Sequence, residues 1–116
     1  MAVKRIVANI GASEIGLAKG FYHDILGLDL VMDQGWIQTF AGEGQTRPQI
    51  SIASEGGSGT PVPDLSIEVD DLDDVHERVV KAGIEVVYGP ADEPWRVRRF
   101  YVRDPFGRLV NILAHS

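Results

Sequence analysis

The chain carries one sequence pattern twice, in two segments that lie about half its length apart. Each copy has an apolar run, an amphipathic stretch, a glycine and a second apolar run, over 7–31 and again over 64–87. The apolar residues of the amphipathic stretches recur at helical spacing and at equivalent offsets. They are Ile15, Ala18, Tyr22 and Ile25 in the first copy and Leu72, Val75, Val79 and Ala82 in the second. This repeat predicts two similar strand-helix-strand modules, in which ligand positions come in equivalent pairs.

The predicted elements form one βαβββ unit in each half of the chain. We expect a helix over 14–26 with strands over 3–10, 28–32, 36–40 and 49–53, and a helix over 71–82 with strands over 64–69, 85–88, 97–102 and 109–114. The segment of about 55–62 is rich in glycine and proline and is predicted to link module one (about 1–54) to module two (about 63–116). We therefore predict a single α+β domain spanning 1–116.

Local signals at the ends of the predicted elements favour structural roles. Ser13 is expected to cap the first helix and Gly27 to end it. The acidic run 70–74 lacks the glycine and glutamate that an EF-hand requires, so we interpret it as the start of the second helix, with Asp71 as the cap. The segment 104–107 has the Asp-Pro-x-Gly order of a type I turn.

Composition and charge exclude several classes of function. The net charge of -6 argues against a nucleic-acid partner and against binding to an anionic membrane, and it permits cationic ligands. The chain has no cysteine, which excludes disulfides, thiolate metal sites and thiol catalysis. The first apolar run is far shorter than a signal peptide and nothing approaches a membrane span, so we expect a cytoplasmic protein.

Three segments in order, 21–28, 65–71 and 100–111, resemble the glyoxalase/bleomycin resistance/dioxygenase family, the vicinal oxygen chelate superfamily. The run 93–95 followed by Arg99-Phe100 is most similar to bleomycin resistance proteins. The resemblance covers essentially the whole chain. It implies two βαβββ modules whose curved mixed sheets enclose a concave face, and a homodimer with ligand clefts at the interface.

Enzymes of this superfamily hold a divalent metal through residues on the first and last strands of both modules. The resemblance places Val7 and Asp64 at the first-strand positions, and Asn111 and either Gln49 or Ser51 at the last-strand positions. A zinc, iron or manganese site needs three or four histidine and carboxylate ligands, and only one of these residues is anionic. We therefore expect no metal, no other cofactor and no catalytic residue.

Strand alternation predicts where a ligand would bind. Asp64, Ser66 and Glu68 share the face opposite to the predicted helix, and Asn111 of the last strand has the same parity. Such a mixture of carboxylates, amides and apolar groups suits an organic ligand, although the same residues could line an inert groove. Aromatic residues on neighbouring strands can stack on planar rings, and we select Trp36 and Trp95. The full predicted ligand site is Trp36, Gln49, Ser51, Asp64, Glu68, Trp95, Phe100 and Asn111.

The sequence thus predicts a metal-free homodimer that sequesters a small aromatic or cationic molecule. Attraction of a cation such as bleomycin by Asp64 and Glu68 would weaken as salt is added. One alternative is a metal-dependent lyase, epimerase or dioxygenase of the same superfamily, with Asp64 as a ligand or general base. The other alternative is a scaffold or interaction module without a small-molecule ligand.

Overall fold

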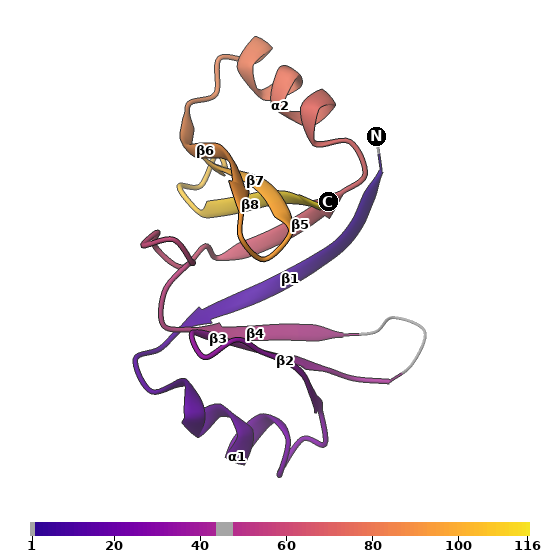
Figure 1. Cartoon of the computed structure of the whole chain (residues 1–116), viewed down its shortest axis with the longest axis vertical. Coiled ribbons are helices and arrows are strands. Elements are labelled where there is room, and N and C mark those ends of the chain that lie inside the picture. Colours follow the sequence, from indigo (N-terminus) through magenta and orange to yellow (C-terminus); the bar gives the residue numbers. More distant parts are fainter. Residues whose placement is uncertain (1, 44–47) are drawn as a thin grey trace. The chain divides into compact units, whose positions relative to one another are not determined.

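The computed structural model describes residues 2–43 and 48–116, and the chain divides into two compact units (Figure 1). The N-terminal unit is Val7–Val62, and the C-terminal unit combines Met1–Ile6 with Pro63–Ser116. The first strand, β1 (Val3–Gly11), therefore contributes residues to both units. Backbone hydrogen bonding explains the division, because the N–H of Asp70 donates to the carbonyl of Ala2 at 3.1 Å.

The N-terminal unit is one βαβββ module. Its four strands lie in the order β2-β3-β4-β1, with β1 parallel to β4 and the other pairs antiparallel. The core lies between this sheet and the helical segment, around Ile15, Phe40 and Ile52. After β1 the elements are a 3-10 turn (Ile15–Leu17), α1 (Ala18–Tyr22), β2 (Asp29–Asp33), β3 (Ile37–Ala41) and β4 (Gln49–Ala53).

The first helix is shorter and less regular than the sequence predicts. A 3-10 turn and a five-residue α-helix replace the continuous helix expected over 14–26. Gly16 and Gly20 lie inside this stretch and lower its helix propensity. The predicted cap at Ser13 is wrong, because the segment begins after Glu14 without a side-chain cap. Gly27 ends the segment as predicted, with a φ of 74° and an N–H that donates to the carbonyl of His23 at 2.9 Å.

The C-terminal unit repeats the same topology. Its strands lie in the order β5-β8-β7-β6, with β5 parallel to β8 and the remaining pairs antiparallel. The two units thus confirm the repeat that the sequence predicts. A core cluster packs beneath the helix: Val69, Leu72, Val79, Phe100, Val102 and Val110. The elements are β5 (Leu65–Val69), α2 (Leu72–Lys81), β6 (Val86–Glu93), β7 (Val97–Arg103) and β8 (Leu109–His115).

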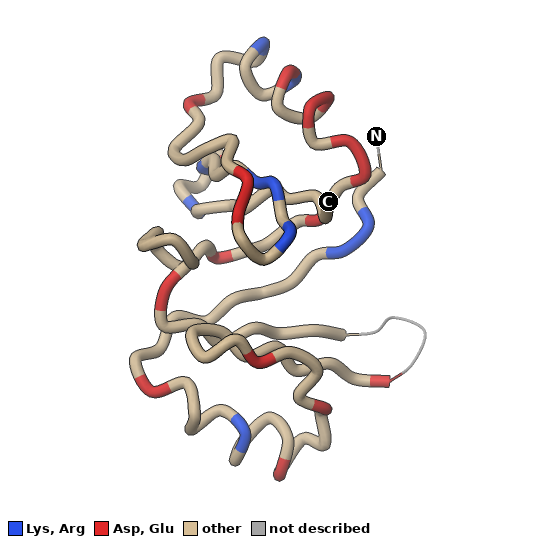
Figure 2. Tube along the Cα trace, in the orientation of Figure 1, with Lys and Arg blue, Asp and Glu red and all other residues tan. Residues whose placement is uncertain are grey.

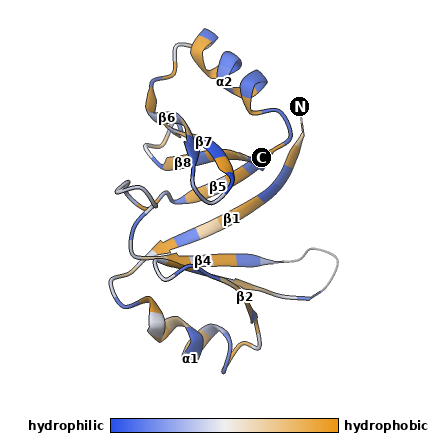
Figure 3. Ribbon diagram, in the orientation of Figure 1, coloured by the Kyte–Doolittle hydropathy of each residue, from blue (hydrophilic) through white to orange (hydrophobic). Residues whose placement is uncertain are grey.

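Helix α2 and the turn before β8 confirm two local predictions. The Asp71 carboxylate accepts a hydrogen bond from the N–H of Asp74 at 3.0 Å, so Asp71 caps the helix. Figure 2 shows the acidic residues at the start of α2 in red. Both hydrophobic and hydrophilic residues occur along α2 (Figure 3), which suits a helix with one buried face. In the turn 104–107, the Asp104 carboxylate accepts from the N–H groups of Phe106 and Arg108, each at 2.9 Å. None of the helices in 2–43 and 48–116 is long and apolar enough to cross a membrane.

Strand β6 continues five residues beyond its predicted end at Tyr88. Pro90 suggests a break in the sequence, but β6 is the outer strand in the order of its unit, where a residue without an N–H is tolerated. Two register irregularities accompany this part of the strand. Gly89 has a φ of 81°, and a Cβ at this position would lie 2.6 Å from the carbonyl oxygen of Arg99. Only glycine permits β6 to approach β7 this closely.

The predicted linker of about 55–62 forms a hydrogen-bonded turn within the N-terminal unit. The N–H of Gly56 donates to the carbonyl of Thr60 at 2.7 Å, and the hydroxyl of Thr60 donates to the carbonyl of Gly57 at 2.7 Å. The N–H of Gly59 donates to the carboxylate of Glu55 at 3.1 Å. This segment therefore has internal structure that its glycine-rich composition does not predict.

Candidate functional site

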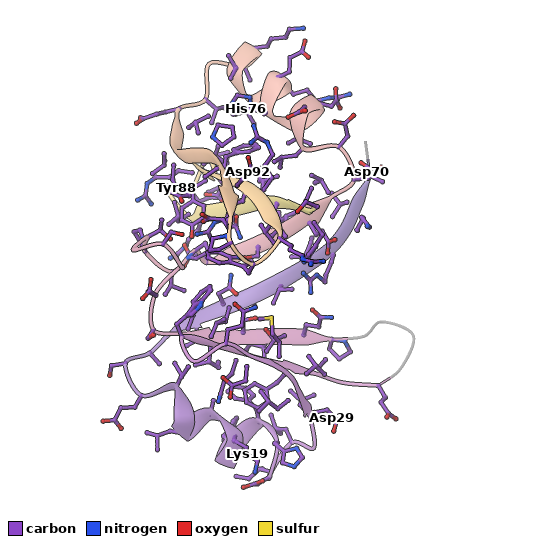
Figure 4. All side chains as sticks on the ribbon, in the orientation of Figure 1. Lys19, Asp29, Asp70, His76, Tyr88 and Asp92 are labelled. Atoms are coloured by element: carbon purple, nitrogen blue, oxygen red, sulfur yellow. The ribbon has the colours of Figure 1, made fainter. Side chains whose placement is uncertain are left out.

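The C-terminal sheet has an apolar face and a polar face. Ile67 and Ile112 pack against the core beneath α2, as the alternation predicts. Residues of the opposite parity form rows across the four strands, and one row joins Ser66, Asn111, Tyr101 and Tyr88 through consecutive register pairs. Figure 4 labels Tyr88 on the outermost of these strands. We use the term polar face for Ser66, Glu68, Tyr88, Glu93, Trp95, Arg99, Tyr101 and Asn111.

A buried ion pair lies on this polar face. The guanidinium of Arg99 contacts the Glu93 carboxylate through Nε at 2.7 Å and Nη2 at 2.6 Å, and the two side chains are 3% and 4% exposed. Nη1 of Arg99 donates to the Tyr101 hydroxyl at 3.0 Å. The hydroxyl of Tyr88 lies 3.1 Å from one oxygen of Glu93 and donates to that carboxylate. The two buried charges therefore neutralise each other and hold the surrounding hydroxyls in place.

Aromatic rings surround the Arg99 guanidinium. Its central carbon lies 5.4 Å from the ring centre of Tyr88, 5.1 Å from that of Trp95 and 5.0 Å from that of Tyr101. Cation-π attraction operates at these distances and favours a defined ring orientation. Trp95 lies in the tight turn between β6 and β7, so this contact ties the turn to the strand beside it.

Sequence analysis selected Trp95 but missed the ion pair and its tyrosines. One signal was present: Val97, Arg99 and Tyr101 share a parity, and a charged residue between two apolar ones requires a buried partner. The partner is Glu93, across the β6–β7 hairpin, and its position depends on the irregular register of β6.

The side-chain amide of Asn111 is incompletely satisfied. Asn111 is 6% exposed, and its Nδ2 donates to the hydroxyl of Ser66 at 3.1 Å. Its Oδ1 is buried and has no hydrogen-bond partner among residues 2–43 and 48–116. A serine hydroxyl can donate or accept, so rotating the amide would exchange the unpartnered atom without removing it. Such a buried group without a partner costs about 1–3 kcal/mol of stability.

Glu68 is neutralised within its own unit. Its carboxylate lies 3.1 Å from Nε of Arg5, 3.7 Å from Nζ of Lys4 and 3.0 Å from Nδ1 of His115. The Glu68 side chain is 12% exposed, so these contacts are partly shielded from water. Basic groups already surround Glu68, and this weakens the sequence-based expectation that its carboxylate attracts a cationic ligand.

Asp64 is the remaining carboxylate of the predicted site. It lies on the surface just before β5, and its Oδ2 accepts a hydrogen bond from the N–H of Leu109 at 3.0 Å. The N–H of Asp64 in turn donates to the carbonyl of Leu109 at 2.8 Å. These two bonds tie the start of β5 to the start of β8, so Asp64 has a structural role that is independent of any ligand.

The environment of Glu68 predicts acid sensitivity. Burial raises the pKa of its carboxyl, but the hydrogen bond with His115 and the charges of Arg5 and Lys4 outweigh burial, and the pKa lies below the usual 4.5. A group with a depressed folded-state pKa stabilises the protein above its unfolded pKa and loses this contribution as pH falls through the folded pKa. We expect the free energy of unfolding to decrease below pH 4.5, and to decrease less in Glu68→Gln. Urea unfolding at a series of pH values around 4.5 would measure the free energy of unfolding of the wild type and of Glu68→Gln. Identical acid sensitivity in the two proteins would contradict the prediction.

Three predicted site residues lie in the N-terminal unit: Trp36, Gln49 and Ser51. Ser51 pairs in register with Asn9 of the first strand, as Asn111 pairs with Ser66. Ser51, rather than Gln49, is thus the positional counterpart of Asn111 in the repeat. Unlike the amide of Asn111, the hydroxyl of Ser51 is satisfied, by Thr39 at 2.8 Å.

The two remaining aromatic residues of the predicted site differ in burial. Trp36 precedes β3 and is half-buried, and its carbonyl accepts from the N–H of Ser54 at 2.9 Å. Phe100 has no exposed surface and belongs to the core beneath α2, where its ring meets the ring of His76 edge-on at 5.2 Å. Phe100 therefore lies on the apolar side of the sheet, and we leave it out of the site proposed below.

The residues at the superfamily's metal positions do not fit a catalytic metal. Val7 has no donor atom, Ser51 and Asn111 are neutral, and Asp64 already accepts a backbone hydrogen bond. Within the described parts of the chain, no three histidine, cysteine, aspartate or glutamate side chains come together in a way that could hold an ion. Zinc, iron and manganese require more anionic or imidazole donors than these positions offer.

Comparison with known proteins identifies the sequence family. The profile described as "Glyoxalase/Bleomycin resistance protein/Dioxygenase superfamily" matches residues 5–112. No curated protein matches the chain.

Solved structures show the same fold at low sequence identity. A protein described as an NAD-dependent benzaldehyde dehydrogenase from Legionella pneumophila has a TM-score of 0.76 and 14% identity, covering 97% of this chain and 100% of its own. The methylmalonyl-CoA epimerase from Mycobacterium tuberculosis has a TM-score of 0.64 and 20% identity, covering 98% and 87%. A glyoxalase/bleomycin resistance protein/dioxygenase superfamily member from Vibrio splendidus 12B01 has a TM-score of 0.65 and 18% identity, covering 97% and 99%. At these identities the likeness concerns the fold alone.

Proposed function

Because the chain belongs to the glyoxalase/bleomycin resistance/dioxygenase superfamily, we propose that it binds and sequesters a small organic molecule containing a flat ring, in the manner of bleomycin-resistance-type proteins and without a resident metal. One observation carries the proposal: the partly exposed rings of Tyr88 and Trp95 lie on the polar face of the C-terminal sheet, which also carries Asn111. Flat rings provide stacking surfaces, and a polar group such as an amide provides a hydrogen bond that orients the ligand.

The available side-chain chemistry supports binding rather than a reaction. Glu93 and Glu68 are each engaged by basic groups, which makes them poor general bases. The donor set at the superfamily's metal positions supports the same conclusion. A metal-dependent lyase, epimerase or dioxygenase is the rival function, and elemental analysis distinguishes the two: zinc, iron, nickel or manganese bound in stoichiometric amount would favour the enzyme.

Replacing Trp95 with alanine is expected to weaken ligand binding more than it weakens the fold. Loss of one stacking contact corresponds to about a three- to tenfold decrease in affinity. A thermal-shift panel of aromatic antibiotics, small keto and hydroxy acids and divalent ions would first identify ligands of the wild-type protein. The Trp95→Phe variant retains a flat ring and serves as the control. Equal losses of melting temperature and affinity in Trp95→Ala would mean that the indole is only part of the core, and a panel without any hit would favour the scaffold alternative.

The homodimer expected from the sequence is part of the same proposal. Leu17, Phe21 and Ile25 of the N-terminal unit are apolar and 72%, 52% and 70% exposed. Exposed apolar residues of this size support contact with another protein surface. Size-exclusion chromatography with light scattering measures the mass directly, and a mass of one chain at all concentrations would contradict a stable dimer.

A further inference from the structure

The α1 segment (residues 15–28) of the N-terminal unit has apolar residues on its exposed side as well as on its buried side. One set packs on the core of the unit: Ile15, Ala18 and Tyr22. Four other large apolar residues form an outer face that is exposed: Leu17 by 72%, Phe21 by 52%, Ile25 by 70% and Leu26 by 56%. A surface helix ordinarily has a polar outer face, and a helix that is apolar all round is ordinarily covered.

The four residues of the outer face are neighbours. The carbonyl of Phe21 accepts from the N–H of Ile25 at 3.3 Å and from that of Leu26 at 3.2 Å, so both residues lie one turn after Phe21. Leu17, four residues before Phe21, has helical backbone angles at the start of α1. Together the four residues expose on the order of 400–500 Å², about half of the area that each partner buries in a stable complex.

Helix α2, the counterpart of α1 in the repeat, has the ordinary polar outer side. Asp74 pairs with Arg78 at 3.0 Å and Glu77 pairs with Lys81 at 2.8 Å, and all four side chains are at least 36% exposed. The fold therefore does not require an apolar outer face on this helix. We interpret the difference between the two helices as a sign that the α1 segment contacts a partner.

The charge of the α1 segment favours a second molecule of this chain as that partner. The segment has one basic residue, Lys19 (Figure 4), and one acidic residue, Asp24; both are exposed, and the net charge with neutral histidine is zero. Glu14 and Asp29 lie in sequence beyond the two ends of the outer face. Two molecules with a net charge of -6 each repel one another less where they meet through an uncharged segment.

The order of the residues suits a symmetric pair. Lys19 and Asp24 lie on either side of Phe21 in the sequence. Around a twofold axis perpendicular to the helix, the α1 segments of two molecules run antiparallel, and the same surface serves both. Lys19 of each molecule then lies at the end where the other molecule has Asp24, so opposite charges meet at both ends of the contact.

We infer that Leu17, Phe21, Ile25 and Leu26 form the contact surface of a symmetric homodimer, in which the α1 segments of two molecules pack antiparallel. This inference rests on the homodimer of the proposed function and names its surface. Gly20 suits the same arrangement: glycine weakens a helix, and a Cβ at this exposed position would meet no described atom of the chain within 4 Å. A glycine allows a second backbone to approach closely.

The double variant Leu17→Gln with Ile25→Gln tests the surface. It retains the net charge and changes side chains that are 72% and 70% exposed, so circular dichroism is expected to match that of the wild type. By sedimentation equilibrium the wild type is expected to be a dimer, and the dissociation constant of the double variant is expected to be at least about tenfold higher. The matched control is Val80→Gln with Phe106→Gln, which changes exposed apolar residues of the C-terminal unit and is expected to dimerise like the wild type.

The outcomes separate this inference from the proposed function. A double variant that dimerises as strongly as the wild type would overturn the inference and leave a homodimer formed through another surface. A wild type with the mass of one chain at all concentrations would overturn both the inference and the proposed homodimer. Ligand binding is measured separately, by the thermal-shift panel, and neither result decides it.

Exchange of charges tests the antiparallel arrangement and changes only exposed side chains. Lys19→Glu and Asp24→Lys each place like charges at both ends of the contact, so each variant alone is expected to dimerise about three- to tenfold more weakly than the wild type. In a mixture of the two variants opposite charges meet again, and mixed dimers are expected to form about as strongly as the wild-type dimer. Added salt should reduce these differences. A mixture that associates no more strongly than the separate variants would overturn the inference.

Discussion

Replacing Glu93 with alanine is expected to lower the free energy of unfolding by about 3–5 kcal/mol, because it removes the carboxylate that pairs with the buried Arg99 guanidinium. Arg99 is 3% exposed and contacts Glu93 through two nitrogens, so the pair is shielded from water. The same change removes the acceptor for the Tyr88 hydroxyl. Urea denaturation of the wild type and the variant would measure the difference.

An exposed ion pair on the same hairpin provides the control. Asp92 and Arg98 lie 3.2 Å apart with side chains that are 80% and 40% exposed, and Asp92→Ala should cost less than about 1 kcal/mol. Replacing both buried partners, as Glu93→Leu with Arg99→Met, should be less harmful than Glu93→Ala alone, since no unpaired charge remains. Equal losses for Glu93→Ala and Asp92→Ala would show that burial does not strengthen the pair.

Replacing Phe100 with alanine is expected to cost about 3–5 kcal/mol, because it empties a fully enclosed part of the core. Phe100 has no exposed surface and packs with Val79 of α2 and Val110 of β8, and its ring meets His76. Thermal or urea unfolding would measure the loss. Phe106→Ala is the control, because that ring is 86% exposed and should contribute little.

A more conservative variant, Phe100→Leu, tests the role that sequence analysis assigned to Phe100. The core location predicts that Phe100→Leu, which preserves most of the apolar volume, retains the affinity for any ligand identified. A large loss of affinity in Phe100→Leu with little loss of stability would indicate that Phe100 contacts the ligand, as the sequence analysis expected. Its neighbours Arg99 and Tyr101 have the opposite parity, which is why one strand carries both a core ring and the polar cluster.

Local patterns predicted most of the fold because their physical causes are local. The helical spacing of the second copy, the strand alternation of the C-terminal unit and the Asp71 cap each depend on residues close together in the chain, and these three are confirmed. The first helix was overestimated since two glycines lower its propensity, and β6 was underestimated since its outer position tolerates Pro90. Periodicity alone contains neither kind of information.

The candidate site was only partly predictable for a different reason. Alternation placed Ser66, Glu68 and Asn111 on one face, but it could not show that Glu68 is surrounded by basic groups from β1 and β8. Likewise, the pairing of Arg99 with Glu93 depends on the register of a bulged hairpin, which no local pattern specifies. The acidic composition suggested a cationic ligand, and only the tertiary structure shows that Glu68 and Glu93 are already paired with basic groups.

The sequence by itself determined the repeated βαβββ architecture, the family, and the shortage of metal donors at the superfamily positions, because these follow from residue type and spacing. Only the tertiary structure decided which charges are neutralised, that Phe100 is core, and that one amide atom of Asn111 lacks a partner among the described residues. Hydrogen bonds and ion pairs between strands depend on register and burial, and both arise from contacts between residues far apart in the chain.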